Sequence, residues 1–510
     1  MINLSTSNNE IGNTYSSIDS NIYEDFQKNG DGEIFEKLVM DLMLNKYSDD
    51  TEVTEYILSL PIDKQRLAIM SLIDGDNNLW SKMNSYVNEC SDKMEHIKDV
   101  VKIINKFVKD GEVDKKKFGE VMTPIKLVRE MLDTLPKEVW SNPDLKWLDP
   151  ANGAGTFPFV IIYKLMIGLI EWEPDTEKRY KHIVENMIYT CELQSRNVFL
   201  WLCGVDPKDE YTTNTYWGSF LDEGFDYHMK NVWGLDGFDI IVMNPPYQEL
   251  KKGNKKSQAL WDKFVIKTLD DLVEGGYLVA VHPDGWRGIT KDYDYVQKLL
   301  KSKQITYLEM HNIADGFETF GANTTYDFYC LHNVPNTMFT KIKCTDGKIE
   351  RLDLSKMVFI PNVNIEFVFS LLANDGEERV NILHSYSNYE TRKEHMSREE
   401  TEEFKYPCAY TVGSKNPNFF YSNKKGKFFE PKVVWGNGLT DVIIDETGKY
   451  GLTQFTYAIA DNVENLKHIQ TALKSEKFKK DVMGYTKGVG HIYNRKIISL
   501  FRKNFWLEFI

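Results

Sequence analysis

The sequence predicts an α/β protein with a Rossmann-like, doubly wound core, and three observations support this fold class. Between residues 118 and 335, short apolar runs alternate with stretches whose apolar residues recur at three- and four-residue spacing. Such alternation is typical of a parallel sheet covered by helices. A glycine-containing turn follows the first apolar run, and two consecutive prolines follow a later one. Because binding loops of such folds follow the carboxyl ends of the strands, both turns are expected to face one crevice.

Six apolar runs and four helical stretches make up the predicted core. The strands are expected at residues 145–150, 187–192, 238–244, 275–283, 305–312 and 324–332. The helices are expected at residues 124–135, 157–170, 196–204 and 259–274. A further strand end is expected within 215–226. The core domain is therefore predicted over residues 113–335.

Regions of different composition and residue pattern flank this core. Residues 1–20 are rich in Ser and Asn and are predicted to form a disordered tail, and 21–112 is predicted to be an acidic helical segment. Residues 1–100 hold 19 acidic against 8 basic side chains. A C-terminal mixed α+β domain is predicted over 340–510, where the stretch 467–503 holds 10 basic against 2 acidic residues. Such local positive charge attracts a polyanion even in a chain of net charge −14, although a solvated surface is the alternative.

The composition argues against several classes of protein. No window of 18 uncharged apolar residues exists, and the N-terminus lacks an apolar signal region, so neither a membrane span nor secretion is expected. The six cysteines form no C-x-x-C pair, which argues against a zinc site and for reduced thiols. We therefore expect no metal, no membrane partner and a cytoplasmic location, in a bacterium or in the host cell of a phage.

The turn after the first strand contains Gly153 and Gly155 and follows Asp149. Glycine permits positive φ and lets a ligand approach the backbone closely. The dinucleotide pattern G-x-G-x-x-G is not met, because Pro158 occupies its third position, and no P-loop sequence lies nearby. The turn alone is thus compatible with a structural or a binding role. Glu192 ends the second strand, where doubly wound folds bind ribose hydroxyls, although an exposed glutamate that opens a helix is the alternative.

The strand at 238–244 leads into the motif Asn244-Pro245-Pro246-Tyr247. An exocyclic amine on a nucleobase is a poor nucleophile because its lone pair is delocalised into the ring. The Asn244 carbonyl and a neighbouring peptide carbonyl can accept its two hydrogens, which directs the lone pair outward. Pro245 fixes φ and thereby the direction of its carbonyl, and Tyr247 offers an aromatic face to an unstacked base. The motif therefore predicts a site for a planar nitrogen nucleophile.

Taken together, these loops resemble the gamma-class, TaqI-type DNA adenine N6-methyltransferases of restriction-modification systems. The resemblance covers about 117–333 and includes the order of cofactor region, catalytic loop and target-recognition domain. It implies S-adenosyl-L-methionine as cofactor and Asn244, Pro245, Pro246 and Tyr247 as the catalytic loop. It further implies that the cofactor is bound by Gly119, Glu120, Thr123, Pro124, Asp149, Asn152, Gly153, Gly155, Glu192, Ser219 and Phe220.

Two positions depart from the pattern of this family. Ser219 stands where relatives carry an acidic residue, so either its hydroxyl or the Asp222 carboxylate would contact the adenine amine of the cofactor. Asn152 stands where a cysteine is common. The second aromatic residue that stacks on the target base is expected within 326–329, and strand alternation favours Phe328.

The resemblance implies methyl transfer to N6 of an adenine in double-stranded DNA. A base inside a duplex cannot reach such a pocket, so the adenine would be flipped out of the helix. Phosphate contacts are expected from Lys255 and Lys256, after the catalytic loop, and from Lys487 and Arg495 near the C-terminus, with ordinary surface positions as the alternative.

Other functions remain open from the sequence. A protein glutamine N5-methyltransferase or an RNA adenine N6-methyltransferase would share the Asn-Pro-Pro-Tyr chemistry. A non-catalytic DNA-binding subunit of a restriction complex is a further alternative, which the altered Ser219 favours slightly. The helical segment 21–112 would dock a partner subunit of a restriction system or cap the catalytic domain. It carries no recognisable nuclease constellation, so DNA cleavage by this chain is not expected.

Overall fold

The computed structural model describes residues 123–206, 210–248, 258–385, 389–412, 417–436, 441–482 and 495–510. The predicted N-terminal tail and helical segment lie outside these residues, as do Gly119, Glu120, Lys255, Lys256 and Lys487. The chain divides into two compact units, which we describe separately. Unit 1 comprises Met1–His282, Lys298–Leu308 and Phe328–Met338, and unit 2 comprises Pro283–Gln297, Glu309–Asp327 and Phe339–Ile510.

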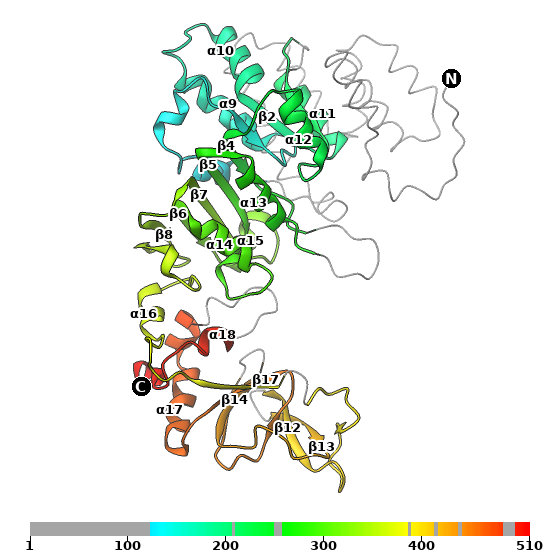
Figure 1. Ribbon diagram of the computed structural model, residues 1–510, viewed down its shortest axis with the longest axis vertical. Coiled ribbons are helices and arrows are strands. Elements are labelled where there is room, and N and C mark those ends of the chain that lie inside the picture. Colours follow the sequence, from blue (N-terminus) through cyan, green and yellow to red (C-terminus); the bar gives the residue numbers. More distant parts are fainter. Residues whose placement is uncertain are drawn as a thin grey trace, which may run out of the picture. The chain divides into compact units, whose positions relative to one another are not determined.

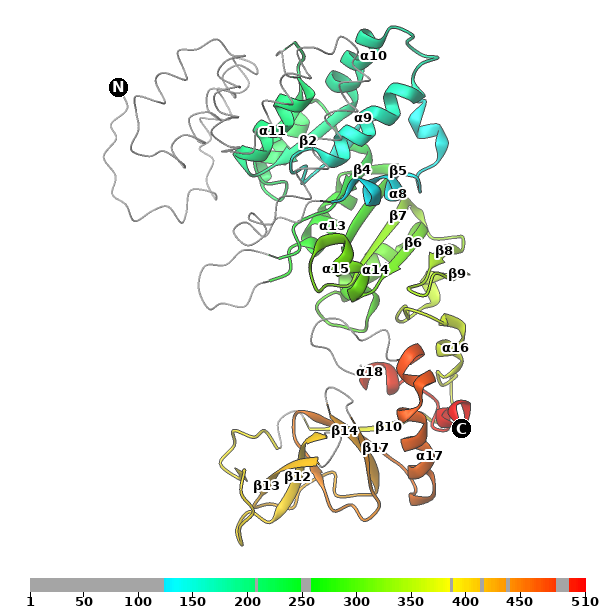
Figure 2. The same cartoon turned by 180° about the vertical axis from the view of Figure 1, so that it is seen from behind.

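A largely parallel sheet organises unit 1 (Figures 1 and 2). The strands that lie wholly or mainly in this unit are β1 (Trp147–Asp149), β2 (Ile188–Glu192), β3 (Asn214–Trp217), β4 (Phe238–Met243), β5 (Leu272–Pro283), β6 (Lys303–His311) and β7 (Tyr326–Pro335). Their order is β3-β2-β1-β4-β5-β7-β6, and the pairs from β3 to β5 are parallel. The predicted doubly wound α/β fold is confirmed.

Helix α8 (Ile125–Leu132) precedes β1. The helices that connect the strands are α9 (Thr156–Gly168), α10 (Thr176–His182), α11 (Ser195–Val205), α12 (Glu223–Asn231), α13 (Trp261–Asp270), α14 (Asp294–Ser302) and α15 (Ile313–Phe320). The chain runs from β1 toward β3 in one direction and from β4 toward β5 in the other. Because such crossovers are right-handed, α9 and α11 cover one face of the sheet, and α12 and α13 cover the other.

The predicted helix at 259–274 is wrong at its C-terminal end. Helix α13 ends at Asp270, and β5 begins at Leu272, which pairs with Phe238 of β4. The apolar residues Leu272 and Val273 fit helical spacing as well as a strand, so the sequence pattern alone could not separate them. The pairing with β4 decides in favour of the strand.

Unit 2 contains short antiparallel strands. An antiparallel pair is formed by β8 (Thr340–Lys343) and β9 (Ile349–Leu352). One sheet has the order β10 (Asn381–His384), β17 (Thr456–Ala460), β14 (Lys432–Gly436), β15 (Val442–Asp445). A second sheet has the order β11 (Met396–Ser397), β13 (Pro417–Ser422), β12 (Tyr406–Val412), β16 (Gly451–Leu452). Helix α15 also belongs to unit 2, as do α16 (Ile365–Ser370), α17 (Val463–Lys474) and α18 (Arg495–Ile498).

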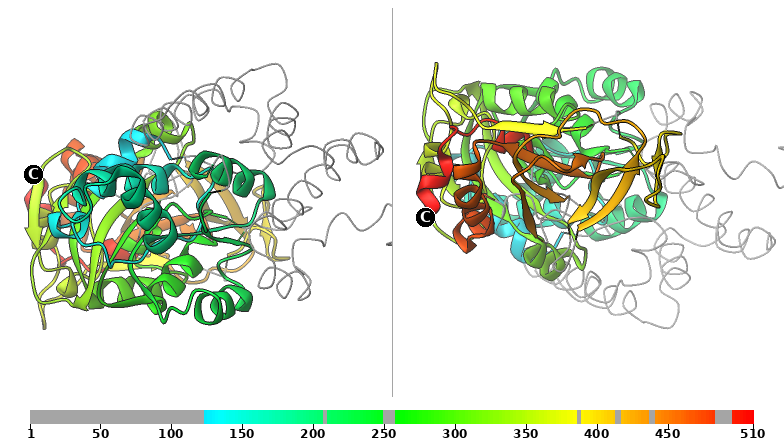
Figure 3. Two further views of the ribbon diagram at one scale, coloured as in Figure 1. Left: turned by 90° about the horizontal axis from the view of Figure 1, so that it is seen from above. Right: turned by 90° about the horizontal axis from the view of Figure 1, so that it is seen from below.

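The side chains of β14 point alternately into two hydrophobic cores of unit 2. The strands around these cores are yellow and orange in the right panel of Figure 3. Val434 packs with Ala409 and Leu452 of the other sheet. Its neighbours Val433 and Trp435 belong to the core that includes Leu466, Ile469 and Leu473 of α17. Successive side chains of a strand point to opposite faces, so one strand serves both cores. Among the described residues of the whole chain, no helix is long and apolar enough to span a bilayer.

Candidate active site

The crevice of a doubly wound sheet lies where the strand order reverses, outside the carboxyl ends of the strands. Here β1 pairs with both β2 and β4, so the reversal falls between β1 and β4. Asp149 ends β1, and Asn244 directly follows β4. The two motifs singled out in the sequence therefore flank the switch point, 95 positions apart in the chain.

The turn after β1 leaves buried acceptor atoms unused. Asp149 is 2% exposed; its Oδ1 accepts the Ala151 N–H at 3.1 Å, whereas Oδ2 has no hydrogen-bond partner among the described residues. Asn152 is also buried, and its Oδ1 lacks a partner within the same described part of the chain, while its Nδ2 donates to the Gly153 carbonyl at 3.0 Å. Buried polar atoms are normally paired. This turn thus has two acceptors suited to a ligand that carries donors or positive charge.

The Asp149 carboxyl is shifted toward its neutral form. Burial raises the pKa of Asp149 to about 8; the hydrogen bond from the Ala151 N–H opposes the rise, and the nearby Glu192 carboxylate adds to it. At neutral pH the carboxyl is therefore mostly protonated as long as no cation lies close to it.

Two glycines of the turn adopt positive φ, 54° at Gly153 and 95° at Gly155. A Cβ atom on Gly155 would lie 2.6 Å from Cε3 of Trp201 and 2.8 Å from Cε2 of Phe159. These two rings, from α11 and α9, are in contact with a centroid distance of 4.9 Å. Gly155 is therefore required by the close packing of both helices, which is a structural reason in addition to any binding role.

Replacing Gly155 by alanine is expected to destabilise the protein by about 2–4 kcal/mol, since backbone strain and overpacking both contribute. Gly234 offers a matched control, because its φ is 68° and a Cβ there would meet nothing within 4 Å. Gly234→Ala isolates the backbone cost, about 1 kcal/mol. Thermal unfolding of both variants separates the backbone cost from the cost of overpacking. Equal losses of stability would show that the two rings move to accommodate the new methyl group.

Glu192 ties the ends of three strands together. Its Oε2 accepts the Gly153 N–H and its Oε1 accepts the Gln194 N–H, both at 2.8 Å. Its backbone carbonyl accepts the Gly218 N–H, beyond β3, at 2.9 Å. Glu192 is thus a built part of the crevice and not an exposed residue that merely opens a helix.

The altered position at Ser219 has an acidic neighbour. The Ser219 hydroxyl is hydrogen-bonded to the Asp222 carboxylate, and its Oγ also accepts the Leu221 N–H at 3.2 Å. Partial burial raises the pKa of Asp222, and the hydrogen bond from Ser219 opposes that rise. The ring of Phe220 is buried against Phe225, at a centroid distance of 4.9 Å. The structure therefore pairs Ser219 with Asp222 and places the Phe220 ring in the core.

The loop after β4 is fixed on both sides. Nδ2 of Asn244 donates to Oγ1 of Thr123 at 2.9 Å. Pro245 is buried, and the half-buried Tyr247 accepts the Leu260 N–H on its backbone carbonyl at 3.1 Å. Gln248 then forms a bridge with Ala259. The loop is therefore anchored before and after its two prolines.

The contact with Thr123 was not predictable from the sequence. The resemblance assigned Thr123 and Pro124 to the methionine end of the cofactor. In the structure, Pro124 is the N-cap of α8, and Thr123, 5% exposed, contacts Asn244 over a separation of 121 positions. No spacing rule connects residues so distant in the chain.

The structure also describes Phe328 and Arg495, two further residues of the predicted site. Phe328 is 1% exposed, and its ring centroid lies 5.9 Å from that of Tyr307; Tyr326 and Tyr329 are equally buried. None of these three rings presents an open face in this structure, and the stacking role of Phe328 stays a prediction. In unit 2, Arg495 begins α18, and its guanidinium lies 5.5 Å from the ring centre of Tyr457, a cation–π contact. Its contact with DNA likewise stays a prediction.

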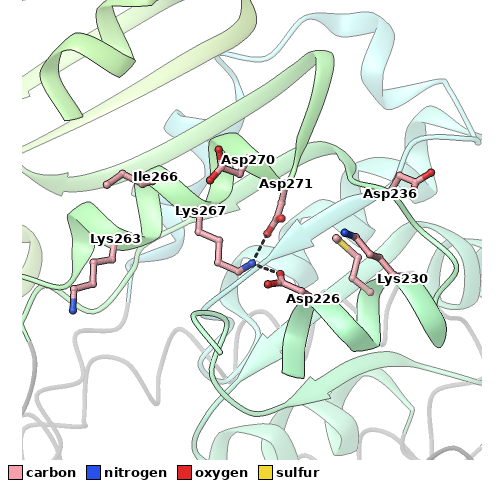
Figure 4. A pocket seen from close by; sticks show the side chains of 9 residues that line it. Asp226, Lys230, Asp236, Lys263, Ile266, Lys267, Asp270 and Asp271 are labelled. Atoms are coloured by element: carbon pink, nitrogen blue, oxygen red, sulfur yellow. Dashed lines mark hydrogen bonds and ion pairs between the residues drawn. The ribbon is translucent and has the colours of Figure 1, made fainter. Parts of the chain in front are cut away.

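A hollow of about 540 Å³ is lined by residues of α12 and α13 (Figure 4). In Figure 4, Lys267 reaches between Asp226 and Asp271, and the distance from Lys267 Nζ to Asp271 Oδ2 is 3.3 Å. Asp236 precedes β4 and Asp271 precedes β5, so this hollow extends to the amino ends of the strands. Burial raises the pKa of Asp271 to about 6, against the influence of Lys267. None of the predicted site residues lines this hollow.

The sequence resembles known methylases. Residues 176–317 match the family model described as Eco57I restriction-modification methylase. A protein of Mycoplasma pneumoniae, described as an uncharacterized adenine-specific methylase, is 25% identical over 363 residues, which are 55% of this chain and 84% of that protein. The family match includes Glu192 and the loop 244–247, whereas the turn after β1 precedes it.

Solved structures show weaker similarity. The Type ISP restriction-modification enzyme LlaGI, solved with a DNA substrate mimic, is 12% identical over 92% of this chain and 63% of that chain, with a TM-score of 0.48. A candidate class I S-adenosylmethionine-dependent methyltransferase from Listeria monocytogenes is 14% identical over 59% of this chain and 88% of that chain, with a TM-score of 0.37. A candidate modification subunit of a type I restriction enzyme from Vibrio vulnificus is 16% identical, with a TM-score of 0.35; the match covers 48% of this chain and about half, 51%, of that subunit. The family match, and not these structural similarities, connects residues 176–317 with restriction-modification methylases.

Proposed function

We propose that this chain transfers a methyl group from S-adenosyl-L-methionine to N6 of an adenine in DNA. The observation that carries the proposal is the position of Asn244-Pro245-Pro246-Tyr247 at the carboxyl end of β4, beside β1 and the buried acceptors of its turn. The match of residues 176–317 to the Eco57I methylase family supports a methyltransferase, and the Mycoplasma pneumoniae relative supports adenine as target. Membership of the gamma class is part of the proposal.

The residues of the crevice fit this cofactor. Asp149 Oδ2 and Asn152 Oδ1 are buried acceptors without a partner among the described residues, and the cofactor carries an ammonium and a sulfonium group. Glu192, which ends β2, would accept the two ribose hydroxyls. The Ser219–Asp222 pair is our candidate for the contact with the adenine amine. When bound, the cofactor supplies an activated methyl group.

The loop after β4 would hold the target amine. The carbonyls of Asn244 and Pro245 accept its two hydrogens, which directs the nitrogen lone pair at the methyl carbon. Such placement would let the amine nitrogen take the methyl group as its bond to sulfur breaks, and the proton would leave the nitrogen afterwards for water. Tyr247 would stack on an adenine that has left the duplex. The basic C-terminal stretch, with Arg495, would contact phosphates.

Cofactor binding is expected to strengthen as the pH rises toward 8. A cationic ligand favours ionised Asp149, so binding releases the proton held by a group whose pKa is about 8 in the free protein. Kd should fall by up to about tenfold per pH unit below 8 and level off above it. Titration calorimetry in buffers of different ionisation enthalpy measures the released proton.

Two variants test the origin of this pH dependence. Asp149→Asn should remove it, whereas Asp271→Asn, which alters another buried carboxyl with a raised pKa, should retain it. A Kd that stays constant between pH 6 and 8 in the wild type would contradict the assignment of Asp149 to a cationic ligand.

Methyl transfer from tritiated S-adenosyl-L-methionine tests the proposed function. The full chain is incubated separately with double-stranded DNA, RNA and a protein substrate that presents a glutamine amide. We expect label in DNA and in its adenine. Label only in RNA, or only in a glutamine side chain, would replace the proposal by one of the two related activities, and label in cytosine would change the target base.

A further inference from the structure

We propose that Thr123 is a positioning residue that holds the amide of Asn244 in its reactive orientation. This inference rests on the proposed function of the loop after β4. It replaces the role implied by the family resemblance, in which Thr123 would hold the methionine end of the cofactor. The two roles predict different kinetic results.

The residues that follow Thr123 constrain its backbone. It directly precedes Pro124, whose φ of −60° is fixed by its ring, and helix α8 begins at the next residue. Ile125, Leu127 and Val128 bury the first turn of α8, which packs against α9. Thr123 therefore lies at the start of a packed helix, which holds its hydroxyl in place.

The hydrogen bond decides which end of the amide lies at Thr123. Nδ2 of Asn244 donates to Oγ1 of Thr123 at 2.9 Å. The amide is planar, with its nitrogen and oxygen on opposite sides of the carbonyl carbon, so anchoring the nitrogen directs the oxygen away from Thr123. A nucleobase amine is a donor and needs an acceptor. A rotated amide would present a second donor to it, and the amine would not be held.

The two prolines of the loop offer the Asn244 side chain no backbone donor. Pro245 and Pro246 carry no backbone N–H, so they cannot donate to the Asn244 carbonyl or to a neighbouring strand. The anchor on the far side, between Gln248 and Ala259, fixes the backbone and not the torsion of the amide. The side-chain contact with Thr123 thus acts on the torsion that the prolines leave free.

The test is Thr123→Val, which removes the hydroxyl at similar size. We expect kcat for methyl transfer to fall about 10- to 100-fold, with Kd for the cofactor unchanged within about twofold. Thr123→Ser keeps the hydroxyl and should restore kcat to within about threefold of the wild type. Thr134→Val is the matched control, because the Thr134 hydroxyl, in the same part of the chain, donates to the Met131 carbonyl at 2.5 Å and also contacts the Cys330 thiol.

The outcomes separate the alternatives. A cofactor Kd raised tenfold or more in Thr123→Val, with kcat preserved, would assign Thr123 to the cofactor and overturn the inference; so would an unchanged kcat. If Thr123→Val fails to fold, Thr123→Ala makes the same deletion and is judged by the same two quantities. A wild-type chain that is inactive on DNA would defeat the proposed function, whereas an active wild type with an equally active Thr123→Val would defeat this inference alone.

Discussion

Replacing Asn244 by alanine is expected to reduce methyl transfer at least about 10²- to 10³-fold, because one of two acceptors for the target amine is lost in a site where preorganised polar groups carry the rate. The side chain follows β4 at the switch point of the sheet, and its amide is already oriented by Thr123. The buried acceptors of Asp149 and Asn152 are untouched by the change. Kd for S-adenosyl-L-methionine should therefore stay within about twofold.

The measurements are single-turnover transfer to DNA and titration with the cofactor. Asn231→Ala serves as the control, since the Asn231 amide donates to the Tyr227 carbonyl at 2.8 Å on the exposed end of α12. Its kcat should equal that of the wild type. Transfer that survives Asn244→Ala would remove the loop from the mechanism, whatever the family match implies.

Replacing Arg287 by methionine is expected to destabilise unit 2 by about 3–5 kcal/mol, which is typical when one partner of a buried ion pair is lost. Arg287 is fully buried, and its Nε donates to Asp327 Oδ2 at 2.7 Å. Its Nη1 donates to Asn362 Oδ1 at 2.7 Å and to the Ile360 carbonyl at 3.1 Å. One guanidinium thus joins the turn after β5, the start of β7 and the segment that follows β9.

The loss should depend on pH in a defined direction. Burial raises the pKa of Asp327 to about 7, and Arg287 opposes that rise. Without Arg287 the pKa of Asp327 rises further, so the folded variant binds a proton more readily than the unfolded chain. The variant therefore regains stability as the pH falls, and its deficit is larger at pH 8 than at pH 6.

Thermal or urea unfolding measures both effects. Arg351→Met is the control, because Arg351 is exposed on β9 and its replacement should change stability by less than about 0.5 kcal/mol. The double variant Arg287→Met, Asp327→Leu should recover much of the loss, since no uncompensated charge stays buried. A loss independent of pH and retained in the double variant would show that the packing of Arg287, and not its charge, stabilises the unit.

The sequence was sufficient to predict the parts of the fold that depend on local residue patterns. The apolar runs that became β2 and β4 were predicted nearly to their ends, because buried parallel strands read as continuous apolar segments. The sequence predicted that the turn after the first strand and the loop at Asn244 face one crevice, and the pairing of β1 with β4 brings Asp149 and Asn244 to neighbouring strands. These parts required only periodicity and the rule that ligands bind at the carboxyl ends of the strands.

The rest depends on contacts between distant residues. The requirement for Gly155 comes from two rings, of Phe159 and Trp201, whose meeting the sequence does not state. The end of α13 is set by pairing of Leu272 with Phe238. Strand alternation placed Tyr326 and Phe328 on one face, yet both rings are buried by their neighbours. The short strands of unit 2 give too little periodicity for a prediction of their sheets.

The most direct test of the central claim is the identity of the methylated nucleoside. DNA is isolated from cells that lack other DNA methyltransferases and express either the wild-type chain or Asn244→Ala, and its nucleosides are separated and weighed by mass spectrometry. The account predicts N6-methyldeoxyadenosine with the wild type and none with Asn244→Ala. N4-methyldeoxycytidine in its place, or an equal yield of N6-methyldeoxyadenosine from both chains, would contradict it.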